Sequence, residues 1–115
     1  MPSKKHRVNV AIFKKLLKFG KRFSGDFINI LYKKADDENS DYRFSVVVSK
    51  KIAKKAHDRN RIKRQVREIV KSFVLDKNIH NLHFVVFLKQ KNTFDKFSEL
   101  KSLILKDLEN FLTRI

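Results

Sequence analysis

A dense run of cationic side chains, suited to binding phosphate groups, occupies residues 49–68, SKKIAKKAHDRNRIKRQVRE. Against two acids it contains nine cations, which are Lys50, Lys51, Lys54, Lys55, Arg59, Arg61, Lys63, Arg64 and Arg67. Each arginine presents a planar fork that can hold two phosphate oxygens, and each lysine adds a compact positive charge. Asn60, between two arginines, adds a neutral donor and acceptor that can discriminate between ligands. The segment therefore predicts binding to a polyanion.

The spacing of apolar residues places much of this run on a helix. In residues 58–74 the apolar positions recur at helical intervals, at Ile62, Val66, Ile69, Val70, Phe73 and Val74. We expect Asp58 to be the N-cap. On the other side of the helix, Asn60, Arg64, Arg67 and Lys71 fall within about 60° of one another, with Lys63 beside them and Arg61 off the far edge. This helix should pack its apolar side on a sheet and present its cations to solvent.

Two other interpretations of the cationic run are open at this point. A charged helix face is often merely solvated, but such faces usually intermix glutamate for i,i+4 pairing, and this one has little of it. Basic helices also occur in DNA-binding and ribosomal proteins, so charge alone does not choose the polymer.

A catalytic centre made by the protein itself is not indicated. The chain has no Cys, which excludes a thiol nucleophile and a cysteine-ligated metal. His57, His80 and His83 form no pair at metal-ligand spacing with a carboxylate on one helical face. No serine or threonine has evident triad partners. We expect neither a catalytic residue nor a metal site in the protein.

The remaining elements follow from similar patterns. Residues 9–19 predict a helix with Asn9 as N-cap and Gly20 as a left-handed stop. Residues 27–33 and 42–49 predict strands joined by an acidic hairpin loop, 35–41. Residues 84–88 predict a central strand covered on both faces, and residues 95–112 a final helix. The order is helix, two or three strands, helix, strand, helix, which is typical of a small α+β or split α/β sandwich.

Size and composition agree with one domain that binds a polyanion. The chain has 115 residues, 28 Lys+Arg against 12 Asp+Glu and a net charge of +16, and 42% hydrophobic residues supply a core. We expect a single domain over residues 1–115. No apolar run approaches the ~18 residues of a membrane span, and the basic N-terminus lacks the apolar region of a signal peptide. A soluble cytoplasmic protein with no membrane partner is expected.

The motifs also carry a family resemblance. The run FSVVVSKK, the spacer IAKKAHD and the helix RNRIKRQVRE resemble the signature of the bacterial ribonuclease P protein component. The similarity continues upstream over FKKLLKFGKRFSG, residues 13–25, and more loosely downstream through residues 84–112.

The resemblance implies a fold and an activity. The fold is α+β, a two-layer sandwich of order α-β-β-β-α-β-α with a four-stranded sheet and a left-handed β-α-β crossover. The implied function is to bind the catalytic RNA of ribonuclease P and the 5′ leader of precursor tRNA, while the complex hydrolyses one phosphodiester to remove the leader. Catalysis and the required Mg²⁺ belong to the RNA-containing holoenzyme, so the protein alone is expected to be inactive and to bind no cofactor, and DNA is not an expected partner.

The resemblance also assigns residues by position. The implied RNA-binding set is Lys50, Lys51, Arg59, Asn60, Arg61, Lys63, Arg64 and Arg67. The implied leader-binding cleft lies between the first helix and the sheet, at Phe13, Leu17 and Leu31. The family often has aromatic residues at the two leucine positions, so leader stacking is weaker here or is supplied by Phe19, Phe23 or Phe27. The alternatives are a stand-alone basic RNA-binding or ribosomal protein, and a protein-only nuclease.

Overall fold

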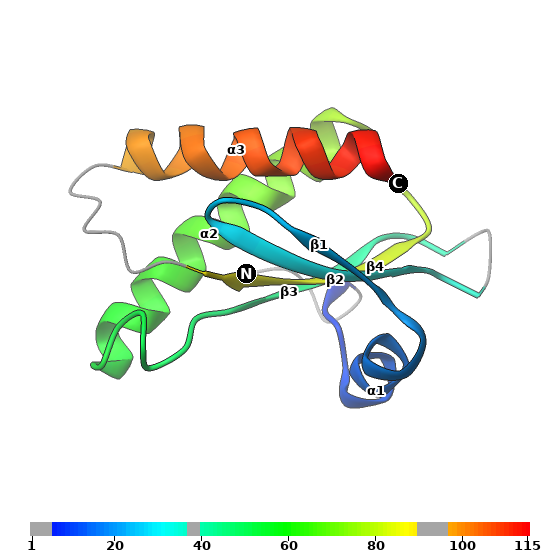
Figure 1. Ribbon diagram of the computed structural model, residues 1–115, viewed down its shortest axis with the longest axis horizontal. Helices are drawn as coiled ribbons and strands as arrows, with labels where there is room; N and C mark the ends of the chain where they lie inside the picture. The colour runs from blue at the N-terminus through cyan, green and yellow to red at the C-terminus, as the bar shows by residue number, and fades with distance from the viewer. Residues whose placement is uncertain (1–5, 37–39, 90–96) are drawn as a thin grey trace.

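The computed structural model describes residues 6–36, 40–89 and 97–115. Its elements follow the expected order of an α+β sandwich, with three helices and one four-stranded sheet (Figure 1). They are α1 (Val10–Phe19), β1 (Lys21–Ser24), β2 (Ile28–Lys34), β3 (Arg43–Val47), α2 (Ala56–Asp76), β4 (Leu82–Leu88) and α3 (Phe97–Arg114). The first two residues of the expected final helix lie outside the described residues.

The sheet has the strand order β1-β2-β4-β3, which makes the expected hairpin between residues 27–33 and 42–49 wrong. Strand β4 lies between β2 and β3, antiparallel to β2 and parallel to β3. Its run of apolar residues has to be covered on both faces, and this favours the centre of the sheet. The loop after β2 instead crosses the start of β4, where the Ala35 N–H donates to Asn81 O at 2.9 Å and the Asn81 N–H donates to Ser40 O at 3.0 Å.

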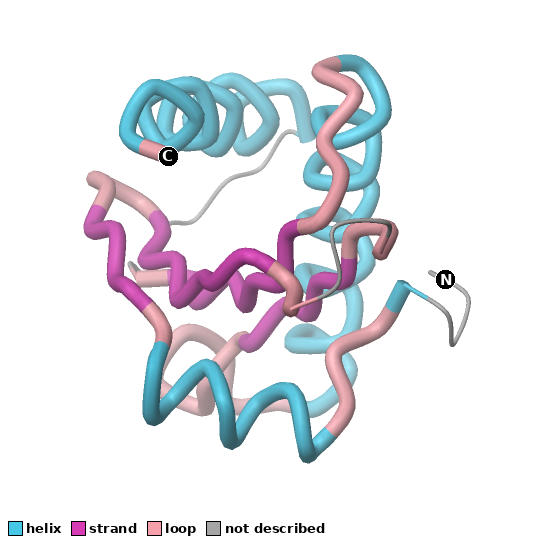
Figure 2. The backbone as a smooth tube through the Cα atoms, turned by 90° about the vertical axis from the view of Figure 1, so that its right-hand side faces the viewer, coloured by secondary structure: helices cyan, strands magenta, loops and turns pink. Residues whose placement is uncertain are grey.

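Helices cover both faces of the sheet. Helices α2 and α3 lie on one face and α1 lies on the other (Figure 2). The parallel strands β3 and β4 are joined through α2. In the view of Figure 1 the path runs from β3 at the back, through α2, which rises from the lower left to the upper right on the α3 side of the sheet, to β4 in front of β3. This geometry makes the crossover left-handed, as the family resemblance implied, although right-handed crossovers are far more common.

Alternation along the strands sorts their side chains into two cores. The larger core joins the sheet to α2 and α3 and includes Phe44, Phe84 and Phe111, each at most 2% exposed. The smaller core joins Leu16 of α1 to Leu31 and Val85. Successive residues of β2 therefore serve opposite faces, with Leu31 under α1 and Tyr32 against α3.

The ends of two helices differ in part from expectation. Asn9 caps α1 as predicted, because its Oδ1 accepts from the Ile12 N–H at 2.9 Å. Gly20, however, has φ −72°, so it is not a left-handed stop. A glycine is needed there because a Cβ would lie 2.4 Å from Leu16 O. Asp58 is not the N-cap of α2, since the helix begins two residues earlier at Ala56 and its cap, Lys55, makes no side-chain hydrogen bond.

A buried carboxylate ties α3 to the β1–β2 turn. Asp107 is 1% exposed, and its oxygens accept hydrogen bonds from the Asp26, Phe27 and Ile28 N–H groups at 3.2, 2.7 and 3.1 Å. Gly25 passes so close that a Cβ there would lie 2.6 Å from Asp107 Cγ. The β1–β2 turn is thus held by one side chain of α3.

Candidate nucleic-acid interface

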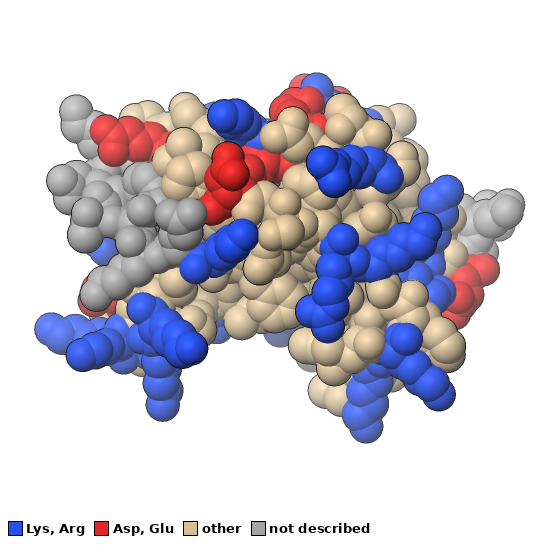
Figure 3. Space-filling view, viewed as in Figure 1, with Lys and Arg blue, Asp and Glu red and all other residues tan. Residues whose placement is uncertain are grey.

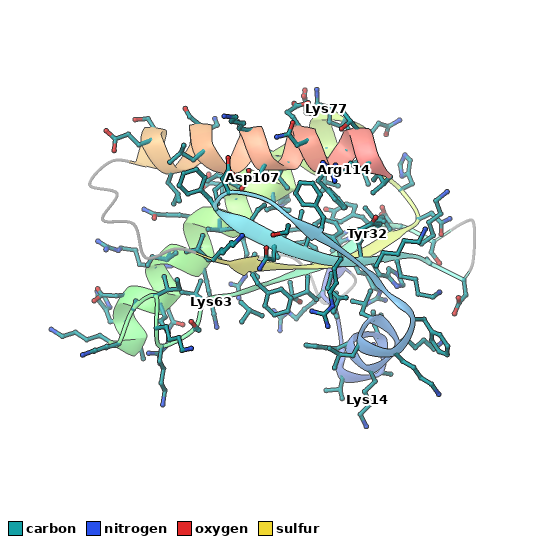
Figure 4. All side chains as sticks on the ribbon, viewed as in Figure 1. Lys14, Tyr32, Lys63, Lys77, Asp107 and Arg114 are labelled. Atoms are coloured by element: carbon teal, nitrogen blue, oxygen red, sulfur yellow. The ribbon has the colours of Figure 1, made fainter. Side chains whose placement is uncertain are left out.

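Helix α2 carries a surface that we call the basic ridge, made of Asn60, Arg61, Lys63, Arg64 and Arg67. Its opposite side is buried against the sheet and α3, as the apolar periodicity predicted, with Val66, Ile69, Val70, Phe73 and Val74 all at most 4% exposed. Asn60, Arg61 and Arg64 are exposed, and Lys63 and Arg67 are half-buried. Figure 4 shows Lys63 on the first half of α2, at the end of the molecule away from Arg114.

The cations of the basic ridge have no acidic partners in the described part of the chain. The ion pairs found there involve His6, Lys15, Lys33, Lys77 and His80, and none involves a residue of the ridge. The ridge therefore presents uncompensated charge, which attracts polyanions over distances comparable with the Debye length.

The loop before α2 adds more cations to the same end of the molecule. Lys50 and Lys51 are exposed in a turn closed by hydrogen bonds from the Ile52 and Ala53 N–H groups to Ser49 O, at 3.0 and 3.3 Å. They lie beyond the end of β3, which stops at Val47 rather than at residue 49 as predicted. A group of Lys and Arg side chains projects from this end of the molecule in Figure 3.

Arg59 differs from the other cations of the predicted RNA-binding set. It is half-buried, and its Nη1 donates to Ala53 O at 3.1 Å and to Lys54 O at 2.7 Å. The side chain therefore fixes the loop that carries the neighbouring lysines to the first turn of α2. This contact positions the loop before α2, in addition to any contact that Arg59 makes with an anion.

The residues predicted for the leader-binding cleft are not equally accessible. Phe13 is half-buried and Leu17 is 57% exposed, whereas Leu31 is 3% exposed beneath Leu16. Leu31 can support a cleft from below but cannot stack with a base. Phe23, one of the proposed aromatic substitutes, is 7% exposed and packs edge-on against Phe111, so it belongs to the core.

Beside α1 the sheet surface is hollowed into what we call the sheet groove, with a volume of about 150 Å³. Its lining includes Arg22 and Ser24 of β1, Asn29 and Leu31 of β2, and Phe87 of β4. Asn29 and Phe87 were missed from the sequence, although alternation along each strand places them on the face opposite the main core. At the end of the groove, Lys89 Nζ donates to Ser24 Oγ and Gly25 O, both at 3.2 Å.

Two ionisable groups near α1 have shifted pKa values. Hydrogen bonds from Lys33 and Lys15, followed by their positive charges, lower the pKa of Asp36 from 3.8 to about 2. Burial, followed by the charges of Arg43 and Lys33, lowers the pKa of His83 below 6.5. His83 is therefore neutral at physiological pH and adds no charge to the α1 face.

Across the described ranges, no group of three His, Asp or Glu side chains is placed to hold a metal ion, and no helix is long and apolar enough to cross a membrane.

Comparison with known proteins shows the family to which the chain belongs. The Ribonuclease P family model matches residues 1–115. The chain belongs to the ribonuclease P protein family. A ribonuclease P protein component from Pseudanabaena is 34% identical over 103 residues, covering 89% of this chain and 83% of that protein. The RNase P protein structure from Thermotoga maritima superposes with a TM-score of 0.69 at 29% identity, covering 95% of this chain and 96% of that one.

Coverage is shorter for other ribonuclease P relatives. The protein component from Microcystis aeruginosa is 35% identical over 72 residues, which is 61% of this chain and 58% of that relative.

Proposed function

We propose that this chain is the protein subunit of ribonuclease P, which binds the catalytic RNA and the 5′ leader of precursor tRNA. The observation that carries the proposal is the basic ridge, whose cations are fixed on one side of α2 and lack acidic partners among the described residues. Family membership supports RNA as the polyanion.

The basic ridge suits the folded catalytic RNA because it is rigid and rich in arginine. Five apolar residues of α2 hold the helix in the core, so the guanidinium groups are presented from a fixed backbone. Their planar forks can each bind two phosphate oxygens, and Asn60 can accept as well as donate. Lys50 and Lys51, in the loop that Arg59 holds against α2, extend the surface.

The sheet groove suits an unpaired RNA strand such as the leader. Phe87 lines the groove and is partly exposed, as is Phe13 on α1, and bases of a single strand stack on such rings. Arg22 and Lys89 lie at the groove and can neutralise phosphates of the same strand. The leader residues proposed here are therefore Phe13 and Leu17 on α1, above a floor that includes Leu31.

The role of the protein in this reaction is to bind and to position RNA. The complex cleaves the phosphodiester at the 5′ end of the mature tRNA with water, releasing the leader. The Mg²⁺ that the family implies for the holoenzyme is assigned to the RNA, since the described residues offer no matching ligand group. By lowering repulsion between catalytic RNA and substrate, the protein reduces the Mg²⁺ needed to hold them together.

Reconstituted cleavage tests this proposal. The purified chain is mixed with a bacterial ribonuclease P RNA and a precursor tRNA, at a Mg²⁺ concentration too low for the RNA to work alone. We expect the protein to stimulate release of the leader, and we expect no cleavage without the RNA. If the chain binds RNA but does not stimulate cleavage of the precursor, it is instead a stand-alone RNA-binding or ribosomal protein. Cleavage by the protein alone, abolished in His57→Ala, would instead identify a protein nuclease.

A further inference from the structure

A second groove lies at the other end of β2, and the proposed function has not used it. It has a volume of about 730 Å³ and lies where β1 and β4 begin, beside the C-terminal end of α3. We call it the C-terminal groove and define it by Phe19, Lys21, Tyr32, Lys34 and Arg114 of its lining. Figure 4 shows Tyr32 and Arg114 at this end of the molecule, away from Lys63 on the basic ridge.

The charged side chains that line the C-terminal groove are cationic, and among the described residues no Asp or Glu lines it. Lys33, which also lines the groove, is paired with Asp36 at 2.7 Å, and nearby Lys77 is paired with Glu109 at 3.2 Å. In contrast, Lys21, Lys34 and Arg114 form no ion pair with any described residue. Three cations that form no ion pair with the described residues make the groove suited to bind phosphates.

The groove also offers an exposed aromatic ring. Phe19, the last residue of α1, is 62% exposed, and Lys18 Nζ lies 5.3 Å from its ring centroid. Tyr32 is held in place by an edge-on contact with Phe111, with ring centroids 5.0 Å apart. An exposed ring beside free cations is the combination that binds unpaired nucleic acid, because bases stack on the ring while phosphates meet the cations.

The strand register connects the C-terminal groove to the sheet groove. Lys21 pairs with Tyr32, and the next pair along the same strands is Arg22 with Leu31. Because side chains alternate, the first pair lines the C-terminal groove and the second lines the sheet groove. Strand β1 is the edge of the sheet, so an extended RNA strand can pass around it from one groove to the other. Lys and Arg side chains cover this part of the surface in Figure 3.

We propose that the C-terminal groove binds the part of the precursor-tRNA leader farthest from the cleavage site, as an unpaired strand. This inference rests on the proposed function, which places the near part of the leader in the sheet groove. A strand leaving the sheet groove around β1 reaches Lys21 first and then Phe19, Lys34 and Arg114. The basic ridge, which serves the catalytic RNA, is at the other end of the molecule.

The test uses the reconstituted complex and a series of precursors whose leaders are shortened stepwise from the 5′ end. We expect the double variant Lys21→Ala, Lys34→Ala to bind the long-leader precursor more weakly than the wild type. Its salt dependence should be shallower by roughly 0.7 log units per lost phosphate contact. The difference from wild type should vanish once the leader is too short to reach β1. Phe19→Ala should lower affinity for long leaders about fivefold or more, and Phe19→Trp should restore it.

A matched control removes the same charge elsewhere. Lys101 and Lys106 are exposed on α3 and do not line the groove, so Lys101→Ala, Lys106→Ala should bind every precursor as the wild type does. Melting followed by circular dichroism verifies that each variant folds.

Different results separate this inference from the proposed function. The inference is overturned if the Lys21→Ala, Lys34→Ala variant binds leaderless tRNA as weakly as it binds the long-leader precursor, or if it binds every precursor as the wild type does. In either case the proposed function still stands if the wild-type chain stimulates cleavage. A wild-type chain that stimulates cleavage of no precursor would overturn both.

Discussion

At the residue scale, exposure separates the aromatic side chains that can stack a base from those that support the core. Phe23, Phe44 and Phe84 are buried, whereas Phe13 of α1 is half-buried and Phe19 is largely exposed. Sequence patterns could place Phe13 on the first helix but could not show that Leu31, 3% exposed, is covered by Leu16. The position of Leu31 on β2 determines the face of the sheet on which its side chain lies. How deeply that side chain is buried depends on how α1 packs against that face.

Phe13→Ala should weaken binding of precursor tRNA with a leader far more than binding of mature tRNA. Loss of one stacked base costs about 1 to 3 kcal/mol, which is roughly five-fold or more in Kd. Competition binding to the reconstituted complex measures both affinities. An equal loss of affinity for mature tRNA would show that Phe13 serves only the packing of α1. Leu17 is also on α1 and is 57% exposed, so Leu17→Ala tests whether Leu17 contributes to leader binding as well.

His83 should make the stability of the sheet dependent on pH. Its pKa is below 6.5 in the folded protein, chiefly because of burial and then because of Arg43 and Lys33. The folded state therefore binds fewer protons than the unfolded state, so stability present above pH 6.5 is lost as the pH falls through 6.5 toward the folded pKa.

We expect the urea midpoint of the wild type to decrease between about pH 7.5 and about pH 5.5, and the decrease to be smaller in His83→Gln. The exposed His57 offers a matched control, because His57→Gln should keep the wild-type pH dependence. Identical pH dependence in wild type and His83→Gln would remove His83 as the cause.

At the scale of elements, α2 and β4 could be predicted because their apolar patterns are long and regular. Strand β1 has only four residues, of which Phe23 alone is buried, so its pattern was too short to decide between two strands and three. The pairing of strands depends on contacts distant in the sequence, which is why β4 between β2 and β3 was not foreseen. The start of α2 was misplaced because Lys55 caps the helix without a side-chain hydrogen bond, a feature no residue type signals.

The three hydrogen bonds from the β1–β2 turn to the Asp107 carboxylate of α3 should contribute much of the stability of that hairpin. In Asp107→Ala, three backbone N–H groups lose a charged acceptor at a buried position, so we expect a loss of roughly 3 kcal/mol in the free energy of unfolding. Urea unfolding measures the loss, and Asp107→Asn should be less destabilised because it keeps one acceptor oxygen.

The exposed Glu109 on the same helix provides the comparison, since its surface pair with Lys77 is worth at most about 1 kcal/mol. If Asp107→Ala were no less stable than Glu109→Ala, the carboxylate would not be the link between α3 and the turn.

At the scale of the whole molecule, the net charge of +16 is divided between surfaces rather than spread evenly. The basic ridge and its loop lie at one end, and Tyr32 and Arg114 of the C-terminal groove lie toward the other (Figure 4). Composition indicated a polyanionic partner, and helical spacing located the ridge. The C-terminal groove could not be seen in the sequence, because it joins residues of α1, β1, β2 and α3 that only the fold brings together.

The most direct test of the central claim is the affinity of the chain for ribonuclease P RNA as a function of salt. Arg61→Ala, Arg64→Ala removes two exposed cations of the basic ridge, and Lys101→Ala, Lys106→Ala removes the same charge from α3. We expect the ridge variant to bind more weakly, with a salt dependence flattened by roughly 0.7 to 0.9 log units per lost phosphate contact, and the α3 variant to match the wild type. Equal slopes for the wild type and the ridge variant would contradict the account.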